Sequence, residues 1–146
     1  MPKILCAIRG GETSQKTQDR AIQLAKENDA ELLYLFVADT AFMDKTARAF
    51  RRDTITREMD HMGEFLLLMA LERARKQGVR ASLLLRHGDF HTELIEAARE
   101  QDIMMLVLGK PAGEDSLFCL KELQALAQEI ETETQVKVVF ADTIDE

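Results

Sequence analysis

The chain has 146 residues, with 26 acidic and 19 basic side chains and a formal net charge of −7. This is the size of one ordinary domain that can bury a core without disulfides or a structural metal, so residues 1–146 are expected to form a single domain. The acidic balance argues against nucleic acid as a partner, because phosphate backbones are bound by clustered Lys and Arg.

The cysteines and the apolar runs indicate in which compartment the protein is expected. Cys6 and Cys119 lack the C-x-x-C spacing of a metal or redox site, which favours free thiols in a reducing cytoplasm. The longest apolar runs, 65–71 and 103–108, are too short to span a bilayer, and no leader pattern is present. We expect a cytoplasmic protein with no membrane partner.

The first part of the chain predicts strand, helix, strand. Residues 3–8 form a short apolar run that ends in Arg9 and two glycines, which indicates a buried strand and a turn. Thr13 or Ser14 is suited to cap the following helix, and residues 32–37 read as a second buried strand.

A connection and a long helix follow. Residues 41–53 have no clear period and predict a connection, with room for a helical turn. A stripe with spacings of four and three then predicts the core-facing side of a helix that ends at Gly78. The stripe consists of Ile55, Met59, Met62, Leu66, Met69 and Arg73, and Gly63 within it indicates close packing.

The second part of the chain continues the alternation. Residues 79–86 predict a strand nearer a sheet edge, and Asp89 is placed to cap the next helix. The inward positions of that helix are Phe90, Leu94, Ile95, Ala97 and Ala98. Residues 103–108 are apolar throughout, which is typical of a central strand. A last helix starting at Asp115 or Ser116, with Leu120, Leu123, Ala127 and Ile130 on one side, and a strand over 136–140 complete the pattern.

Five strands alternating with four helices predict an α/β fold, a parallel sheet with helices on both faces. In such sheets ligands bind at the carboxyl ends of the strands, at a switch point. The loops after Ile8, Val37, Arg86 and Leu108 all leave from that edge.

The order of these motifs resembles the universal stress protein (UspA-like) family over nearly the whole length. The matching parts are the strand 3–8 with its glycine turn, the strand ending in Phe36 and Val37, the long second helix, the Gly88-Asp89 turn, and residues 102–109. The resemblance implies a Rossmann-like five-stranded sheet in the order 3-2-1-4-5. It also implies dimerisation, commonly through the fifth strand.

Nucleotide-binding members of that family carry an aspartate after the first strand. After the fourth strand they carry Gly, two residues, Gly, nine residues, then Gly and Ser or Thr. Here Arg9 replaces the aspartate, and the loop from Gly109 to Gly113 is one residue wider. Leu123 and Gln124 stand where the Gly-Ser pair is expected. The chain therefore resembles a divergent member with a degenerate ATP-binding motif.

The candidate ligand site lies in these loops. Arg9 and Lys110 follow buried strands and could each meet a phosphate, or they could be solvated loop charges; both interpretations stay open. The candidate residues are Ile8, Arg9, Val37, Gly88, Gly109, Lys110 and Gly113. No catalytic residue and no metal ligand is predicted, and no cofactor is expected to be required, although ATP or another nucleotide remains open.

Several enzyme and receiver patterns are missing from the sequence. The Walker spacing and the Gly-x-Ser-x-Gly elbow do not occur. His87 and His91 flank Asp89 without a third ligand, which favours ordinary surface or capping histidines. A receiver domain needs acidic residues where Arg9 and Arg86 stand.

The favoured function is a stress-response or regulatory module that acts by binding a partner or small ligand, without catalysis. The alternative is a nucleotide-binding protein with a rebuilt site, with or without slow ATP hydrolysis. Residues 136–140, from Val136 to Phe140, are expected to mediate a homodimer because they form an apolar edge. Residues 42–57, from Phe42 to Arg57, carry basic and apolar side chains and are expected to form a lid or arm for an anionic ligand or protein partner.

Overall fold

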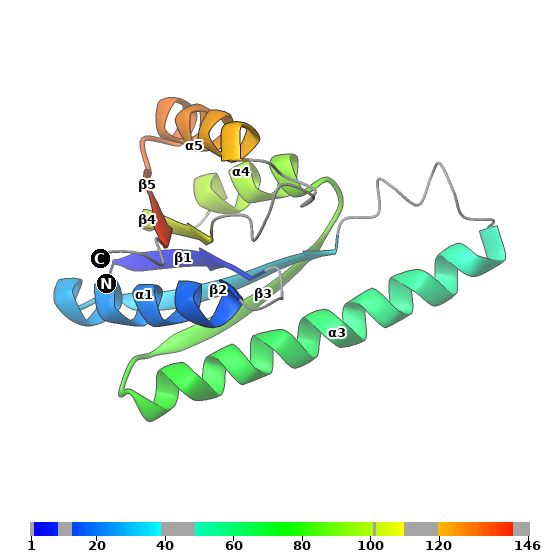
Figure 1. Ribbon diagram of the computed structural model, residues 1–146, viewed down its shortest axis with the longest axis horizontal. Coiled ribbons are helices and arrows are strands. Elements are labelled where there is room, and N and C mark those ends of the chain that lie inside the picture. The colour runs from blue at the N-terminus through cyan, green and yellow to red at the C-terminus, as the bar shows by residue number, and fades with distance from the viewer. Residues whose placement is uncertain (1, 9–12, 39–48, 101, 110–119, 142–146) are drawn as a thin grey trace.

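The computed structural model describes residues 2–8, 13–38, 49–100, 102–109 and 120–141 (Figure 1). Strands and helices alternate through these ranges. In chain order they are β1 (Lys3–Ala7), α1 (Thr13–Asn28), β2 (Glu31–Ala38), α3 (Ala49–Lys76), β3 (Ala81–His87), α4 (Phe90–Glu100), β4 (Ile103–Gly109), α5 (Leu120–Thr134) and β5 (Lys137–Ala141).

The five strands form one parallel sheet in the order β3-β2-β1-β4-β5, which confirms the predicted fold class. The apolar strands β1 and β4 are neighbours at its centre, and β3 lies at an edge, as predicted. The fifth strand begins at Lys137, one residue later than predicted, and lies at the other edge.

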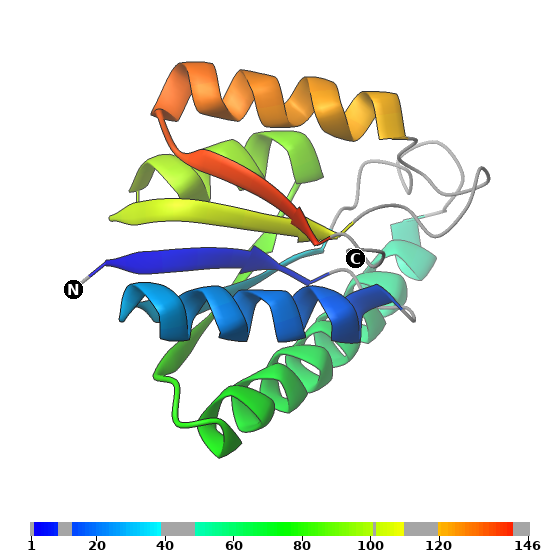
Figure 2. The ribbon, with the colours of Figure 1, turned by 60° about the vertical axis from the view of Figure 1, so that its left-hand side comes forward.

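Helices cover both faces of the sheet, α1 and α3 on one side and α4 and α5 on the other (Figure 2). Alternate residues of β1 pack against the helices on opposite faces of the sheet, because successive side chains of a strand point to opposite faces. Ile4 and Cys6 pack with α1 and α3, whereas Leu5 and Ala7 pack with α4 and α5. This double coverage explains why the inner strands are apolar at every position.

The predicted helix ends are confirmed at two places. The Asp89 carboxylate accepts hydrogen bonds from the backbone N–H of Thr92 at 2.9 Å and from its hydroxyl at 3.0 Å, which is an N-cap of α4. Gly78 has φ +77° and follows the end of α3, where its N–H donates to the carbonyl of Arg75. The five predicted inward residues of α4 are all buried.

The long helix α3 corrects two predictions. The connection predicted over 41–53 is wrong for residues 49–53, because α3 begins at Ala49; residues 41–48 lie outside the described ranges. The predicted core stripe is also wrong in part, since Met62 and Met69 are exposed. The buried face consists of Gly63, Leu67, Ala70 and Ala74, with Met59 and Leu66 partly buried beside it.

The close packing predicted at Gly63 is confirmed, because a Cβ atom at this position would collide with the ring of Phe36 on β2. A 28-residue helix is also longer than the strands beneath it, about 42 Å against about 27 Å for the longest strand. The first turns of α3 accordingly project past the sheet (Figure 1). None of the helices in the described ranges combines the length and apolar content that a membrane crossing requires.

Candidate functional site

The carboxyl edge of the sheet has the predicted switch point. β1 and β4 pair side by side, yet the helices that follow them pack on opposite faces, α1 with one hydrophobic cluster and α5 with the other. The chain therefore diverges above the two strands, which is where open α/β sheets bind ligands. Of the candidate residues, Ile8, Val37, Gly88 and Gly109 are described at this edge. Arg9, Lys110 and Gly113 lie outside the described residues.

Gly109, the last residue of β4, lies against Thr17 of α1. A Cβ atom added at Gly109 would be 2.5 Å from the Thr17 hydroxyl oxygen, closer than any real Cβ contact. Thr17 is itself 3% exposed, so it has little room to withdraw. A glycine is thus required here to let α1 pack over the end of the sheet. Gly109, which is predicted as a ligand contact, thus has a structural role in this packing.

Two of the candidate backbone N–H groups already have partners within the fold. The N–H of Ile8 donates to the carbonyl of Leu35 at 2.7 Å, and that of Gly88 donates to the carbonyl of Ala38 at 3.1 Å. Gly88 has φ +137°, a conformation that favours glycine. These two residues therefore shape the edge and do not offer their amides to an anion.

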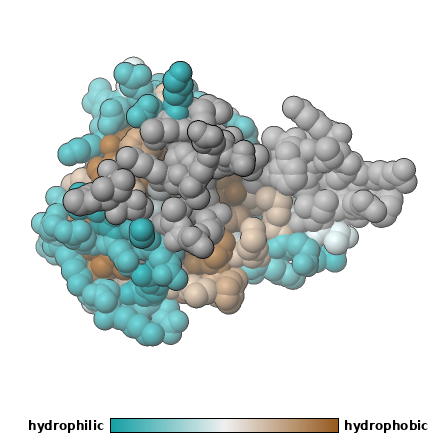
Figure 3. Space-filling model, viewed as in Figure 1, coloured by the Kyte–Doolittle hydropathy of each residue, from teal (hydrophilic) through white to brown (hydrophobic). Residues whose placement is uncertain are grey.

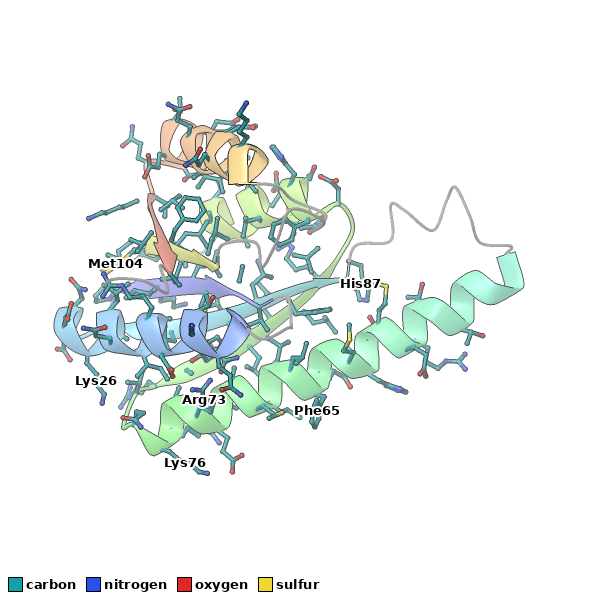
Figure 4. The ribbon with its side chains drawn as sticks, viewed as in Figure 1. Lys26, Phe65, Arg73, Lys76, His87 and Met104 are labelled. Carbon is teal, nitrogen blue, oxygen red and sulfur yellow. The ribbon has the colours of Figure 1, made fainter. Side chains whose placement is uncertain are left out.

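The end of β3 makes side-chain contacts with two different helices. The Arg86 guanidinium contacts the Glu93 carboxylate of α4 at 2.6 Å, and both side chains are largely shielded. His87 contacts Asp60 of α3 at 2.7 Å. Figure 4 labels His87 where β3 ends beside α3. These contacts position the β3 end between α3 and α4, next to the candidate site.

The histidines do not converge on a common point. His87 lies against Asp60 of α3, whereas His91 contacts Glu129 of α5 at 2.8 Å. In the described part of the chain no three His, Cys, Asp or Glu side chains are grouped as metal ligands. Both histidine side chains are partly exposed, which agrees with the prediction of ordinary surface histidines.

Cys6 and Tyr34 are the reactive side chains nearest the centre of the sheet, and both are fully buried. Burial raises the pKa of the Cys6 thiol to about 12 and also raises the pKa of the Tyr34 hydroxyl. A neutral, inaccessible thiol is not a nucleophile. The described residues therefore shape this edge. Arg9 and Lys110, which either contact a phosphate or stay solvated, lie outside the described residues.

Sequence reasoning missed Thr17, Asp60 and Glu93. Glu93 follows the Asp89 cap within the first turn of α4, and that spacing could have indicated a role near Gly88. Thr17 stands one helical turn before the buried Ala21, so it could have been assigned to the core face of α1. Nothing in the sequence pairs Asp60 with His87, which are 27 positions apart.

The described surface also has a groove away from the candidate site. It runs between α1 and α3 and is lined by Asp19, Ile22, Gln23, Lys26, Arg73, Lys76 and Gln77. Arg73, predicted to face the core, instead bridges the two helices by donating to Gln18 at 2.9 Å and to Asp19 at 2.5 Å (Figure 4). This groove lies between two packed helices and is not part of the carboxyl edge.

The sequence of this chain is similar to that of a known protein family. The model of the Universal stress protein family matches residues 1–118. Universal stress protein YxiE of Bacillus subtilis is 32% identical over 114 residues, covering 73% of this chain and 77% of that protein.

Solved structures share the fold. A universal stress protein family member from Burkholderia pseudomallei superposes with a TM-score of 0.73 at 22% identity, covering 94% of this chain and 93% of that one. The universal stress protein of Archaeoglobus fulgidus in complex with dAMP has a TM-score of 0.62 at 14% identity, with 96% of both chains covered. A universal stress protein in complex with cAMP also has a TM-score of 0.62, at 18% identity, with 95% and 94% covered.

Proposed function

Because the chain belongs to the universal stress protein family, we propose that it acts as a stress-response or regulatory module that binds a small ligand or a partner at the carboxyl edge of its sheet, without catalysis. The observation that carries this proposal is the switch point, where α1 and α5 diverge above the neighbouring strands β1 and β4. The deep burial of Cys6 and Tyr34 supports binding over covalent chemistry.

Nucleotide binding is the second candidate function. Two structural relatives were solved with the nucleoside monophosphates cAMP and dAMP. A monophosphate needs fewer phosphate contacts than ATP, and Arg9 and Lys110 are the cations that follow β1 and β4 in the sequence. We therefore propose Ile8, Arg9, Val37, Gly88, Gly109, Lys110 and Gly113 as the residues around the ligand. The site would then suit a nucleotide with few phosphates better than ATP with magnesium.

Native mass spectrometry of the gently purified protein tests the main proposal. We expect an added mass that corresponds to a small anionic molecule, and a nucleotide mass would favour the second candidate. The Arg9→Glu, Lys110→Glu variant should lose the added mass while keeping its thermal stability. Protein that carries no ligand, and that also fails to bind added dAMP or cAMP, would count against a small-ligand site at this edge.

We further propose that residues 42–57 assist binding as a basic arm. The helical part of this segment begins at Ala49, in the turns of α3 that project past the sheet (Figure 1). Arg48, Arg51 and Arg52 are basic residues of the segment in an otherwise acidic chain. They could attract an anionic ligand or an acidic partner.

Reversal of Arg48, Arg51 and Arg52 to glutamate tests the arm. We expect the affinity for dAMP, measured by calorimetry, to fall at least tenfold, with stability within about 1 kcal/mol of the parent, as for surface changes. Arg80→Glu, exposed at the amino end of β3, is the matched control and should bind normally. Unchanged affinity in the triple variant, or its unfolding, would rule the arm out.

Two finer proposals concern assembly and location. We propose a homodimer that uses the β5 edge, residues 136–140, where Val138 and Phe140 are only partly buried. The backbone N–H of Val138 donates to the Glu131 carboxylate at 3.0 Å, so it is not available to pair with a strand of another chain. Side-chain contacts would therefore carry much of this interface. A cytoplasmic location is a further proposal, made from the sequence alone.

A further inference from the structure

Helix α3 carries a second apolar face, opposite the one that packs on the sheet. Met62, Phe65, Leu68 and Met69 are 49%, 62%, 57% and 45% exposed. The buried residues Leu67 and Ala70 are on the other side of the same helix. Figure 3 shows tan and brown atoms gathered over the middle of α3, between teal regions. We call these four residues the outer stripe of α3.

The exposed apolar side chains of the described residues are concentrated in the outer stripe. Among the described residues five large hydrophobic side chains are strongly exposed, and four of them belong to this stripe. Half-exposed side chains of this size present on the order of 400 Å² together, within the range of the largest patch on a typical monomer, which is often functional. A standard interface buries about 800 Å² per partner, so the stripe could form the centre of one.

Charges bracket the stripe in a self-complementary way. Glu58 and Lys76 are both exposed, one before the stripe and one after it. They are eighteen positions apart, which is five turns of 3.6 residues, so they lie on one line along the helix surface. Figure 4 shows Phe65 and Lys76 on the same side of α3, away from the sheet. In the described part of the chain, neither Glu58 nor Lys76 has an ion-pair partner.

We propose that the outer stripe binds a second copy of this chain, with the two α3 helices antiparallel. A two-fold axis would place Phe65 of each chain beside Met69 of the other and Glu58 beside Lys76 at both ends. Such an isologous contact repeats every pair twice, which matches a patch that has opposite charges at its two ends. A partner of different sequence would have no need of this internal symmetry.

This surface is separate from the β5 edge. α3 packs on β2 and β3, and β3 is the sheet edge opposite β5. The two surfaces could therefore act together, and the proposal does not depend on the ligand site.

Sedimentation equilibrium over a wide concentration range tests the pairing. Phe65→Glu should weaken self-association at least tenfold, because it places a charge at the centre of the stripe. Ala125→Glu, an exposed change on α5, is the matched control and should leave the association unchanged. Circular dichroism melts should show both variants folded, since both sites are exposed.

Charge exchange separates self-pairing from any other partner. Glu58→Lys and Lys76→Glu should each weaken association about three- to tenfold, and the double variant should restore it, because the exchanged charges again meet across the two-fold axis. A monomeric parent at all concentrations would overturn the proposal, and so would association that none of these variants changes, as for a dimer formed only through β5. Weakening that the double exchange does not restore would also overturn it.

Discussion

Cys6 and Tyr34 lie together in the layer between the sheet and helices α1 and α3. The Tyr34 hydroxyl has no hydrogen-bond partner among the described residues, and its burial, followed by the nearby Cys6, raises its pKa. The burial of Cys6 is predictable from the sequence, because the apolar run around it is a local signal. The neighbourhood of Cys6 and Tyr34 depends on the pairing of β1 with β2, which no local pattern reveals.

These two groups predict a loss of stability in alkali. The pKa of Cys6 rises from 9.0 to about 12 on folding, so the thiol of the unfolded chain ionises first. Between about pH 9 and 12 the unfolded state binds fewer protons at Cys6 than the folded state, so this group lowers the free energy of unfolding by about 1.4 kcal/mol per pH unit. Below pH 9 the contribution of Cys6 is fully present.

Urea unfolding between about pH 9 and 10.5 measures this slope. Cys6→Ala should lower the slope by about 1.4 kcal/mol per pH unit, because the titrating thiol is gone. Ile4→Val, a mild truncation in the same cluster, is the control and should keep the parent slope. Equal slopes in the parent and Cys6→Ala would contradict the burial of a neutral thiol.

Among the helices, the buried face of α4 can be predicted from the sequence, whereas the buried face of α3 cannot. The cap and inward positions of α4 were predictable, because they depend on residues within one or two turns. α3 has apolar residues on two faces, and spacing alone cannot tell which face meets the sheet. In the structure the face that contains Gly63 meets the sheet, because Phe36 of β2 approaches the helix backbone at this position.

Gly63→Ala tests that contact. In an ordinary helix this change gains about 1 kcal/mol, but overpacking a core costs about 1–3 kcal/mol. Because the Phe36 ring is 4% exposed and has little room to move, we expect a net loss of about 1 kcal/mol in denaturant unfolding. The exposed neighbour Glu64→Ala should stay within about 0.5 kcal/mol of the parent. A gain in stability from Gly63→Ala would show that the ring yields.

At the scale of the molecule, the α/β class followed from the alternating apolar runs, whereas the strand order came from the family resemblance. The candidate site was only partly predictable. Ile8, Val37, Gly88 and Gly109 do lie at the carboxyl edge. Thr17, Asp60 and Glu93 reach it through helix packing, which couples positions far apart in the sequence.

The position of β5 at the edge of the described sheet leads to a prediction about self-association. Val138→Lys should weaken self-association measured by light scattering, because a charge would replace an apolar side chain at the proposed interface. Lys137→Arg keeps the charge of the edge and is the control. A parent that scatters as a monomer at every concentration, or a Val138→Lys variant that associates as well as the parent, would exclude this interface.

We propose that this family member works by binding, and its sequence lacks the standard ATP motif. The most direct measurement is the melting temperature with millimolar ATP and magnesium. A micromolar site would add about 4 kcal/mol at this concentration, or roughly 10 °C for a domain of this size. We expect a shift below about 2 °C, because Arg9 replaces the aspartate and Leu123 and Gln124 replace the Gly-Ser pair. A rise of many degrees would show that ATP binds tightly despite these replacements.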